Sequence, residues 1–132
     1  MRVLLDTNLL IQRPRFEDLP EEFADARFVT AAICLAEVQE GEFSTDPAVR
    51  VRAPLDYVQA KAALGPGLPF DDQAAAVYRA ICAAVDAQGR QVARRRVDLM
   101  IAATALAHDC ALATRNPDDF TGLAPLLEII VL

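Results

Sequence analysis

Acidic residues in this sequence stand directly beside strongly apolar stretches. Asp6 follows the apolar residues 3–5, and Asp98 lies at the start of the apolar, alanine-rich stretch 97–108. Charged groups in apolar surroundings need partners, and neither residue has a lysine or histidine close to it in the sequence. A divalent cation would stabilise several such carboxylates at once, and Mg²⁺ and Mn²⁺ prefer oxygen ligands. The candidate ligands are Asp6, Glu37, Asp98 and Asp119.

Each candidate ligand also has a purely structural interpretation. Asp6 could cap a helix that begins just after it, and Asp98 could be favoured by the dipole of the helix that it opens. Glu37 could be a solvated helix residue, and the acidic pair 118–119 could belong to a turn after a proline. The residue types alone leave these alternatives open.

The scarcity of other reactive side chains limits the kinds of catalytic site that the sequence can form. The sequence has one histidine, His108, and one serine, Ser44. This composition excludes a histidine-rich zinc site, and the residues around Ser44 do not form a nucleophile elbow. A cation held by carboxylates lowers the pKa of bound water and neutralises charge on a phosphodiester. Hydrolysis would then need no histidine, and we expect His108 to be an ordinary residue at a helix end.

The composition is that of a single folded domain, residues 1–132, because 54% of the residues are hydrophobic and the length is typical of one domain. The formal net charge of −6 argues against a protein that coats nucleic acid through a basic surface. Without the four candidate ligands the charge would be −2, so much of the acidic excess belongs to the candidate site. The three cysteines, Cys34, Cys82 and Cys110, are far apart and odd in number, which indicates reduced, buried thiols in a cytoplasmic protein. We expect neither a signal peptide nor a membrane span.

Apolar runs and helical stretches alternate along the chain, which predicts an α/β fold with a parallel sheet of five strands, or nearly so, flanked by helices. The expected strands are residues 3–5, 27–30, 68–70, 111–113 and 128–132. The expected helices are residues 9–13, 31–40, 45–64, 71–88 and 97–108, with a kink or break at Pro54 in the third. In such a sheet, functional residues lie beyond the carboxyl ends of the strands, where Asp6 and Thr114 stand.

Four short motifs occur in order along the chain. In this order and spacing they resemble the PIN-domain ribonucleases, and most closely the VapC toxins of bacterial toxin–antitoxin pairs. The motifs are Leu4-Leu5-Asp6-Thr7-Asn8, Ala36-Glu37-Val38, Asp98-Leu99-Met100-Ile101-Ala102-Ala103-Thr104-Ala105 and Thr114-Arg115-Asn116-Pro117-Asp118-Asp119-Phe120.

The resemblance implies a PIN-like domain with metal-dependent endoribonuclease activity that uses one or two Mg²⁺ or Mn²⁺ ions. It also implies a transfer RNA or ribosomal RNA substrate, a VapB-type antitoxin bound across the active site, and a homodimer, for which the apolar residues 9–11 are one candidate surface. Asp6, Glu37 and Asp98 match the acidic metal centre of the family, and Asp119 matches a fourth, more variable acidic position. The supporting polar positions are Thr7, Asn8, Thr114 and Asn116.

Three consecutive arginines, Arg94, Arg95 and Arg96, precede Asp98 and depart from the pattern of many relatives. They are either a solvated basic turn or groups that bind RNA phosphate beside the metal site. Arg115 in the fourth motif is a further candidate for phosphate binding.

Other functions are open to a chain of this kind. A PIN-fold nuclease could process RNA outside a toxin–antitoxin pair, and a PIN fold could bind partners without cleaving RNA, although the complete carboxylate set argues against the latter. A non-catalytic, receiver-like signalling domain needs a lysine after a late strand, whereas Lys61 is the only lysine and lies in an expected helix. A haloacid-dehalogenase-type phosphatase needs a second aspartate where this sequence has Asn8.

Overall fold

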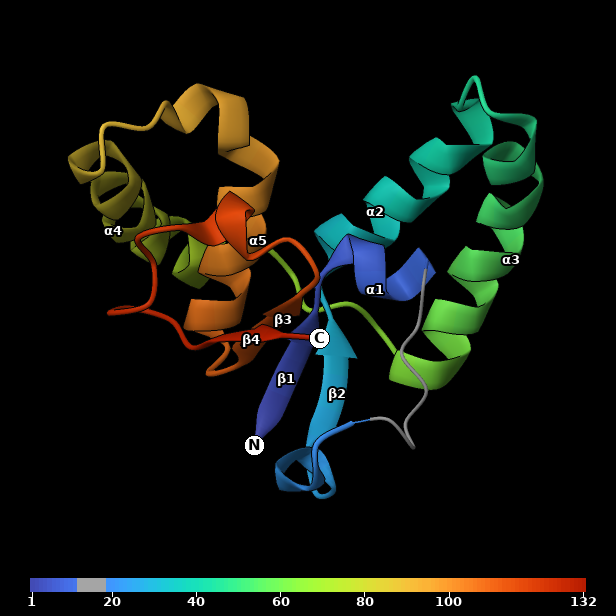
Figure 1. The fold of residues 1–132 in the computed structure, drawn as a ribbon, viewed down its shortest axis with the longest axis horizontal. Helices are drawn as coiled ribbons and strands as arrows, with labels where there is room; N and C mark the ends of the chain where they lie inside the picture. The colour runs from blue at the N-terminus through green and yellow to red at the C-terminus, as the bar shows by residue number, and fades with distance from the viewer. Residues whose placement is uncertain (12–18) are drawn as a thin grey trace.

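A four-stranded parallel sheet forms the centre of the computed structural model, which describes residues 1–11 and 19–132 (Figure 1). Its strands are β1 (Arg2–Leu5), β2 (Arg27–Thr30), β3 (Ala111–Thr114) and β4 (Ile129–Val131). They lie side by side in the order β2-β1-β3-β4, and every pairing is parallel. The predicted α/β class and parallel sheet are therefore confirmed.

The central strands are buried on both faces, as their continuous apolar runs predict. Leu4 of β1 lies opposite Leu112 of β3, and neither side chain is exposed to solvent. Where these two strands end, the backbone N–H of Asp6 donates a hydrogen bond to the carbonyl of Ala113 at 2.9 Å. This register brings Asp6 next to Thr114 at the carboxyl edge of the sheet.

Helices connect the strands and cover the sheet. The α-helices are α1 (Thr7–Ile11), α2 (Ala32–Glu40), α3 (Pro47–Leu64), α4 (Asp72–Ala87) and α5 (Arg96–Ala107). The 3₁₀-helices are η2 (Glu21–Phe23), η3 (Gly41–Phe43), η4 (Val92–Arg95) and η5 (Pro117–Phe120). Among the residues that the structure describes, no helix is long and apolar enough to cross a membrane.

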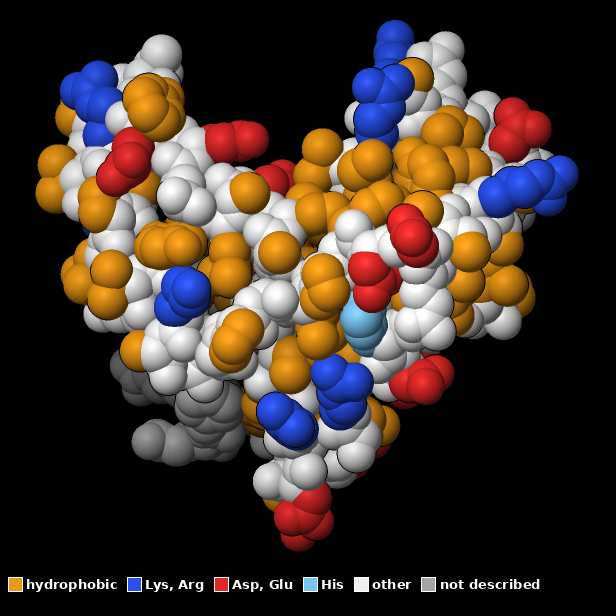
Figure 2. Space-filling view, turned by 180° about the vertical axis from the view of Figure 1, so that it is seen from behind, with side chains coloured by type: hydrophobic (Ala, Val, Ile, Leu, Met, Phe, Trp, Pro, Cys, Tyr) orange, Lys and Arg blue, Asp and Glu red, His pale blue; other side chains and the backbone are white. Residues whose placement is uncertain are grey.

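Two arms rise beyond the carboxyl edge of the sheet, one made of α2 and α3 and the other of α4 and α5 (Figure 1). The space-filling view shows a notch between them, with acidic side chains at the inner edge of the α2–α3 arm (Figure 2). Asp46 and Asp71 cap α3 and α4, because each side chain accepts a hydrogen bond from a first-turn N–H at 3.0 Å. Helix α5 carries buried side chains along most of its length, as its apolar sequence predicts.

The strand expected at residues 68–70 is reduced to a single parallel bridge between Leu68 and Ala31. The N–H of Leu68 donates to the Thr30 carbonyl at 2.8 Å, and the Leu68 carbonyl accepts from the N–H of Ala32 at 2.9 Å. Gly67 permits this approach, because a Cβ there would lie 2.6 Å from the backbone nitrogen of Ala32. The sheet thus has four strands and one bridge in place of a full fifth strand.

Of the kink or break expected at Pro54, the break is wrong, because α3 continues as one helix through this residue. Proline removes the hydrogen bond to the carbonyl four residues earlier, here that of Arg50. Both residues are exposed, so water can satisfy that carbonyl.

Residues 9–11 do not form the exposed apolar surface considered for a homodimer. Leu9 and Leu10 belong to the core, with 0% and 1% of their surface exposed, and Ile11 alone is exposed. The helix starts at Thr7, two residues earlier than expected, and its expected end before Pro14 lies outside the described residues.

The three cysteines are free, with Cys34 and Cys110 buried and Cys82 half-buried. His108 caps the end of α5, as expected.

Candidate functional site

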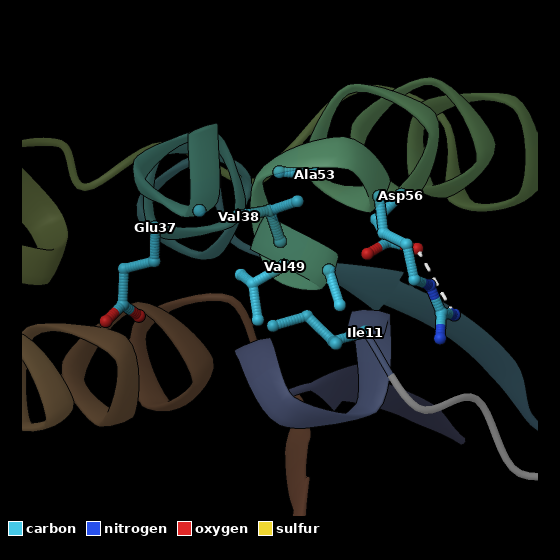
Figure 3. Close-up of a pocket in the computed structure, with 9 residues that line it drawn as sticks. Ile11, Glu37, Val38, Val49, Ala53 and Asp56 are labelled. Atoms are coloured by element: carbon cyan, nitrogen blue, oxygen red, sulfur yellow. Dashed lines mark ion pairs between the residues drawn. The ribbon is translucent and has the colours of Figure 1, made fainter. Parts of the chain in front are cut away.

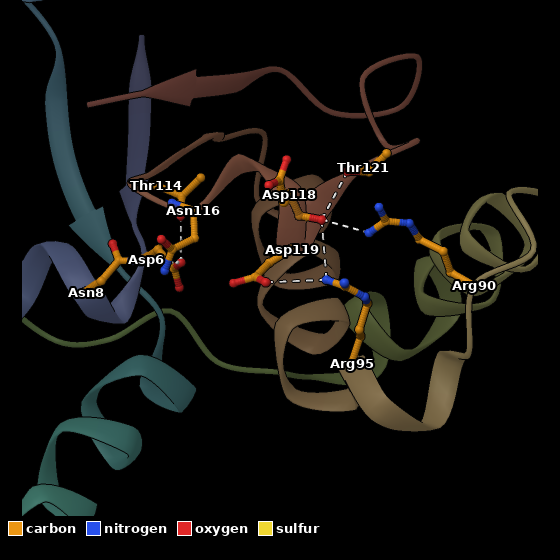
Figure 4. Close-up of polar contacts among 9 residues, drawn as sticks. All are labelled: Asp6, Asn8, Arg90, Arg95, Thr114, Asn116, Asp118, Asp119 and Thr121. Carbon is orange, nitrogen blue, oxygen red and sulfur yellow. Dashed lines mark hydrogen bonds and ion pairs between the residues drawn. The ribbon is translucent and has the colours of Figure 1, made fainter.

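Asp6 is a buried carboxylate held in one orientation by three hydrogen bonds. Only 4% of its surface is exposed. Its Oδ1 accepts from the backbone N–H of Thr7 at 2.8 Å, and its Oδ2 accepts from the Thr114 hydroxyl at 2.9 Å and from the Asn8 amide at 3.3 Å. Figure 4 shows Asp6, Asn8 and Thr114 where β1 and β3 end. Burial raises the pKa of the Asp6 carboxyl, while the hydrogen bonds from Thr114 and Thr7 lower it.

A second layer of hydrogen bonds fixes the loop that follows β3. The backbone N–H of Asn116 donates to the Thr114 hydroxyl oxygen at 3.0 Å, and the N–H of Arg115 donates to the Asn8 side-chain oxygen at 3.3 Å. The predicted supporting residues Thr7, Asn8, Thr114 and Asn116 thus all lie within the hydrogen-bond network around Asp6.

Thr7 links Asp6 to Glu37 on α2. Its backbone N–H contacts Asp6, and its hydroxyl donates to Glu37 Oε1 at 2.6 Å. Burial raises the pKa of Glu37, the Thr7 hydrogen bond lowers it, and the charges of Asp6 and Glu40 raise it. One residue at the start of α1 therefore positions carboxylates that come from two separate parts of the chain.

Asp98 and Asp119 are the other two predicted carboxylates, and they come from α5 and η5. Asp98 lies in the first turn of α5, and Asp119 lies in η5. The pKa of Asp98 is raised to about 6, first by burial and then by the charges of Asp119, Asp6 and Glu37. The charges of the other three predicted carboxylates therefore disfavour the ionised form of Asp98.

Electrostatic repulsion of this kind is relieved by a bound cation, and the donor set consists of the carboxylate oxygens that Mg²⁺ and Mn²⁺ prefer. Within residues 1–11 and 19–132, however, no three or more acidic, histidine or cysteine side chains lie together in a group that could hold a metal ion. Mg²⁺ usually keeps several waters and binds through one or two carboxylates. An open site that leaves places for water fits such an ion, and it does not fit a structural zinc.

The raised pKa of Asp98 predicts how stability depends on pH in metal-free protein. Between about pH 4 and pH 6 the folded state binds a proton that the unfolded state releases, so the free energy of unfolding falls as pH rises through this range. Asp98→Asn removes this effect and should stabilise the protein by about 1–2 kcal/mol at neutral pH, allowing for solvent screening. Urea denaturation in EDTA at several pH values measures it.

Asp72→Asn is the matched control, because Asp72 is exposed and lies in the first turn of α4 as Asp98 lies in the first turn of α5. It loses only a favourable interaction with the helix dipole, so it should be slightly destabilising. Equal destabilisation by both variants at neutral pH would contradict the assigned repulsion at Asp98.

Several arginines lie close to Asp98 and Asp119. Arg94 and Arg95 line a cavity of about 350 Å³ together with Arg90, Asp98 and Asp119. Arg96 has a different neighbour, since its charge lowers the pKa of Tyr78 on α4, which burial raises. Arg115 is exposed next to Asn8.

Sequence patterns do not single out Arg90 as a site residue. Its Nη1 donates to the Asp118 carbonyl at 2.9 Å, and a backbone acceptor carries no signal in the sequence. The one available clue is the density of charge, because residues 90–96 contain four arginines.

A second cavity, of about 210 Å³, lies beside Glu37 and is lined by residues of α1, α2 and α3 (Figure 3). Its middle is apolar, with Ile11, Val38 and Val49. Asp56 lies among the lining residues and is 7% exposed, with the Arg52 guanidinium 4.0 Å from its carboxylate. An apolar groove with acidic groups at both ends therefore adjoins the site.

The family model for the PIN domain matches residues 3–124. VapBC-5 from Mycobacterium tuberculosis, a member of the VapBC family of toxin–antitoxin systems, has a TM-score of 0.76 and 25% identity, covering 99% of this chain and 97% of that chain. FitAcB from Neisseria gonorrhoeae has a TM-score of 0.71 and 26% identity, covering 97% and 96%. A comparison of the sequence with curated proteins finds no match.

A further structure shares the fold at lower identity. VapBC2 from Rickettsia felis, solved bound to a DNA fragment from their promoter, has a TM-score of 0.78 and 21% identity, covering 100% of this chain and 99% of that chain. These similarities extend over nearly the full length of both chains in each comparison.

Proposed function

Because the chain belongs to the PIN domain family, we propose that it is an endoribonuclease that depends on Mg²⁺ or Mn²⁺ and acts as the toxin of a toxin–antitoxin pair. The observation that supports this proposal is that three carboxylates from separate parts of the chain act on a fourth. The pKa of Asp98 is raised to about 6, first by burial and then by the charges of Asp119, Asp6 and Glu37. A divalent cation is the ligand that such a group favours.

Each carboxylate has a distinct part in the proposed centre. Asp6 and Asp98 are the principal ligands, Glu37 completes the centre directly or through a water, and Asp119 holds a water or a second ion. When bound, the cation would lower the pKa of a water and neutralise charge on the RNA phosphodiester. Thr7, Thr114 and Asn8 keep the Asp6 oxygens in place, and Thr7 holds Glu37 in addition.

The proposed partner is a VapB-type antitoxin. This part rests on the structural relatives, two of which are described as VapBC assemblies and match this chain over nearly its full length. The acidic notch and the groove of Figure 3 support a partner segment that combines basic and apolar residues. A homodimer, a cytoplasmic location and a transfer or ribosomal RNA target belong to the same proposal.

The other functions have less support. A receiver-like domain does not agree with a family match that covers residues 3–124. A PIN nuclease that acts outside a toxin–antitoxin pair would use the same carboxylates, so the identity of the partner, and not the site, separates it from the proposal.

Cleavage mapping tests the proposed activity. Purified full-length chain is incubated with total bacterial RNA in Mg²⁺ or in EDTA, and the new 5′ ends are sequenced. We expect new ends at a small number of sequences in Mg²⁺ and none in EDTA, because the carboxylates alone do not activate water. The same new ends in EDTA would show that the cation is not required, and an absence of new ends in both conditions would contradict the nuclease.

A further inference from the structure

Two arginine side chains converge on one backbone oxygen beside the carboxylates. Arg90 Nη1 and Arg95 Nη1 donate to the carbonyl of Asp118 at 2.9 Å and 3.3 Å. Figure 4 shows both guanidinium groups directed at this atom. Two like charges so close together repel each other, and the carbonyl that they share carries no net charge.

Among the residues that the structure describes, the hydrogen bonds of these two arginines to Asp118 and Asp119 use only Nη1 of each side chain. A guanidinium has five N–H donors, so the others can serve a ligand. Arg95 also pairs with Asp119 at 3.4 Å, and 28% of the Arg95 side chain is exposed. The cavity of about 350 Å³ next to them gives access from solvent, and exposed Arg94 adds a third positive charge to its lining.

The charged lining of the cavity is mixed. Asp98 and Asp119 contribute carboxylates, and Arg90, Arg94 and Arg95 contribute guanidinium groups. The carboxylates suit a cation, and the guanidinium groups suit an anion with several oxygen acceptors. Arginine binds phosphate with two parallel hydrogen bonds, which a single acceptor atom does not permit.

We propose that Arg90, Arg94 and Arg95 form a phosphate subsite that holds the RNA backbone next to the phosphodiester at the carboxylates. This inference rests on the proposed function, since it names where the substrate of that site binds. When a phosphate enters the cavity, Arg95 contacts it in place of Asp119, and the Asp119 carboxylate becomes free for the cation side of the site. The subsite binds phosphate whether or not a cation is present.

RNA binding in EDTA tests the subsite without any cleavage. The probe is a fluorescein-labelled oligouridylate, and its fluorescence anisotropy is followed across a range of KCl concentrations with the full-length chain. We expect the Arg90→Gln, Arg94→Gln, Arg95→Gln triple variant to bind at least about tenfold more weakly at low salt. The slope of log affinity against log salt should fall by about 0.7 for each phosphate that the variant no longer binds.

Arg27→Gln is the matched control, because Arg27 is exposed at the amino end of β2, the end of the sheet opposite to the site. It should bind RNA as the wild type does. The Arg90→Lys, Arg95→Lys double variant should keep most of the salt dependence and lose part of the affinity, since lysine keeps the charge and lacks the paired donors. Melting temperatures measured for all variants separate lost binding from lost folding.

Two results would overturn the subsite. One is wild-type affinity and salt slope in a folded triple variant, and the other is a wild type that does not bind the oligouridylate at all. Neither result decides whether the carboxylates cleave RNA, because the mapping experiment in Mg²⁺ answers that separately. An oligothymidylate measured in parallel shows whether the same arginines bind any phosphate backbone. If they do, the triple variant loses equal affinity for both probes.

Discussion

Replacing Asp98 with asparagine is expected to lower the rate of RNA cleavage by about 10³-fold at saturating Mg²⁺. The substitution removes one negative charge and keeps the size and shape of the side chain. Asp98 is the position where the charges of Asp119, Asp6 and Glu37 act together, so the cation has most to gain there. The single-turnover rate on an RNA identified by cleavage mapping measures the effect.

Loss of folding does not account for this expected loss of activity. The same substitution should stabilise the metal-free protein, because it removes a carboxylate that burial and neighbouring charges destabilise. Asp72→Asn, in the first turn of α4, should leave the cleavage rate unchanged. Cleavage by Asp98→Asn at the wild-type rate would contradict the assignment.

A substitution at Asp6 would not separate the loss of a cation ligand from a loss of stability. Its two oxygens accept hydrogen bonds from the Thr7 N–H, the Thr114 hydroxyl and the Asn8 amide. Asparagine would place an NH₂ group opposite at least one of these donors, at a side chain that is 4% exposed. Lost activity in Asp6→Asn would therefore combine lost ligation with lost stability, whereas the two effects have opposite signs in Asp98→Asn.

The sheet and the positions of the carboxylates are predictable from the sequence for a simple physical reason. Continuous apolar runs are typical of strands buried on both faces, and parallel strands bring their carboxyl ends to one edge. Asp6 and Thr114 follow two such strands and are hydrogen-bonded in the structure. Their roles toward a cation stay a prediction, since the geometry shows their proximity and not their ligand.

Other features depend on contacts that residue types do not reveal. The link from Thr7 to Glu37 exists because α1 starts at Thr7, two residues earlier than the sequence indicated. The role of Arg90 depends on the backbone carbonyl of Asp118. Pro54 does not interrupt α3 because it lies on an exposed face of the helix, and exposure follows from packing rather than from the local sequence.

The affinity for a cation should fall together with the cleavage rate. The wild type should bind Mn²⁺, and Asp98→Asn should bind it at least about 100-fold more weakly, because a ligand has been lost and not merely a residue that orients one. The affinity of the wild type should also fall as pH falls below about 6, since Asp98 must lose its proton to ligate a cation. The oxygen-donor set and the open geometry predict no comparable preference for zinc.

Calorimetric titration of Mn²⁺ into chelator-treated protein shows whether these carboxylates form a cation site. The wild type, Asp98→Asn and Asp72→Asn are titrated under the same conditions at neutral pH. We expect saturable binding to the wild type and to Asp72→Asn, and a loss of that binding in Asp98→Asn. Binding of Mn²⁺ that is equal in all three proteins, or absent from the wild type, would contradict the proposed cation site.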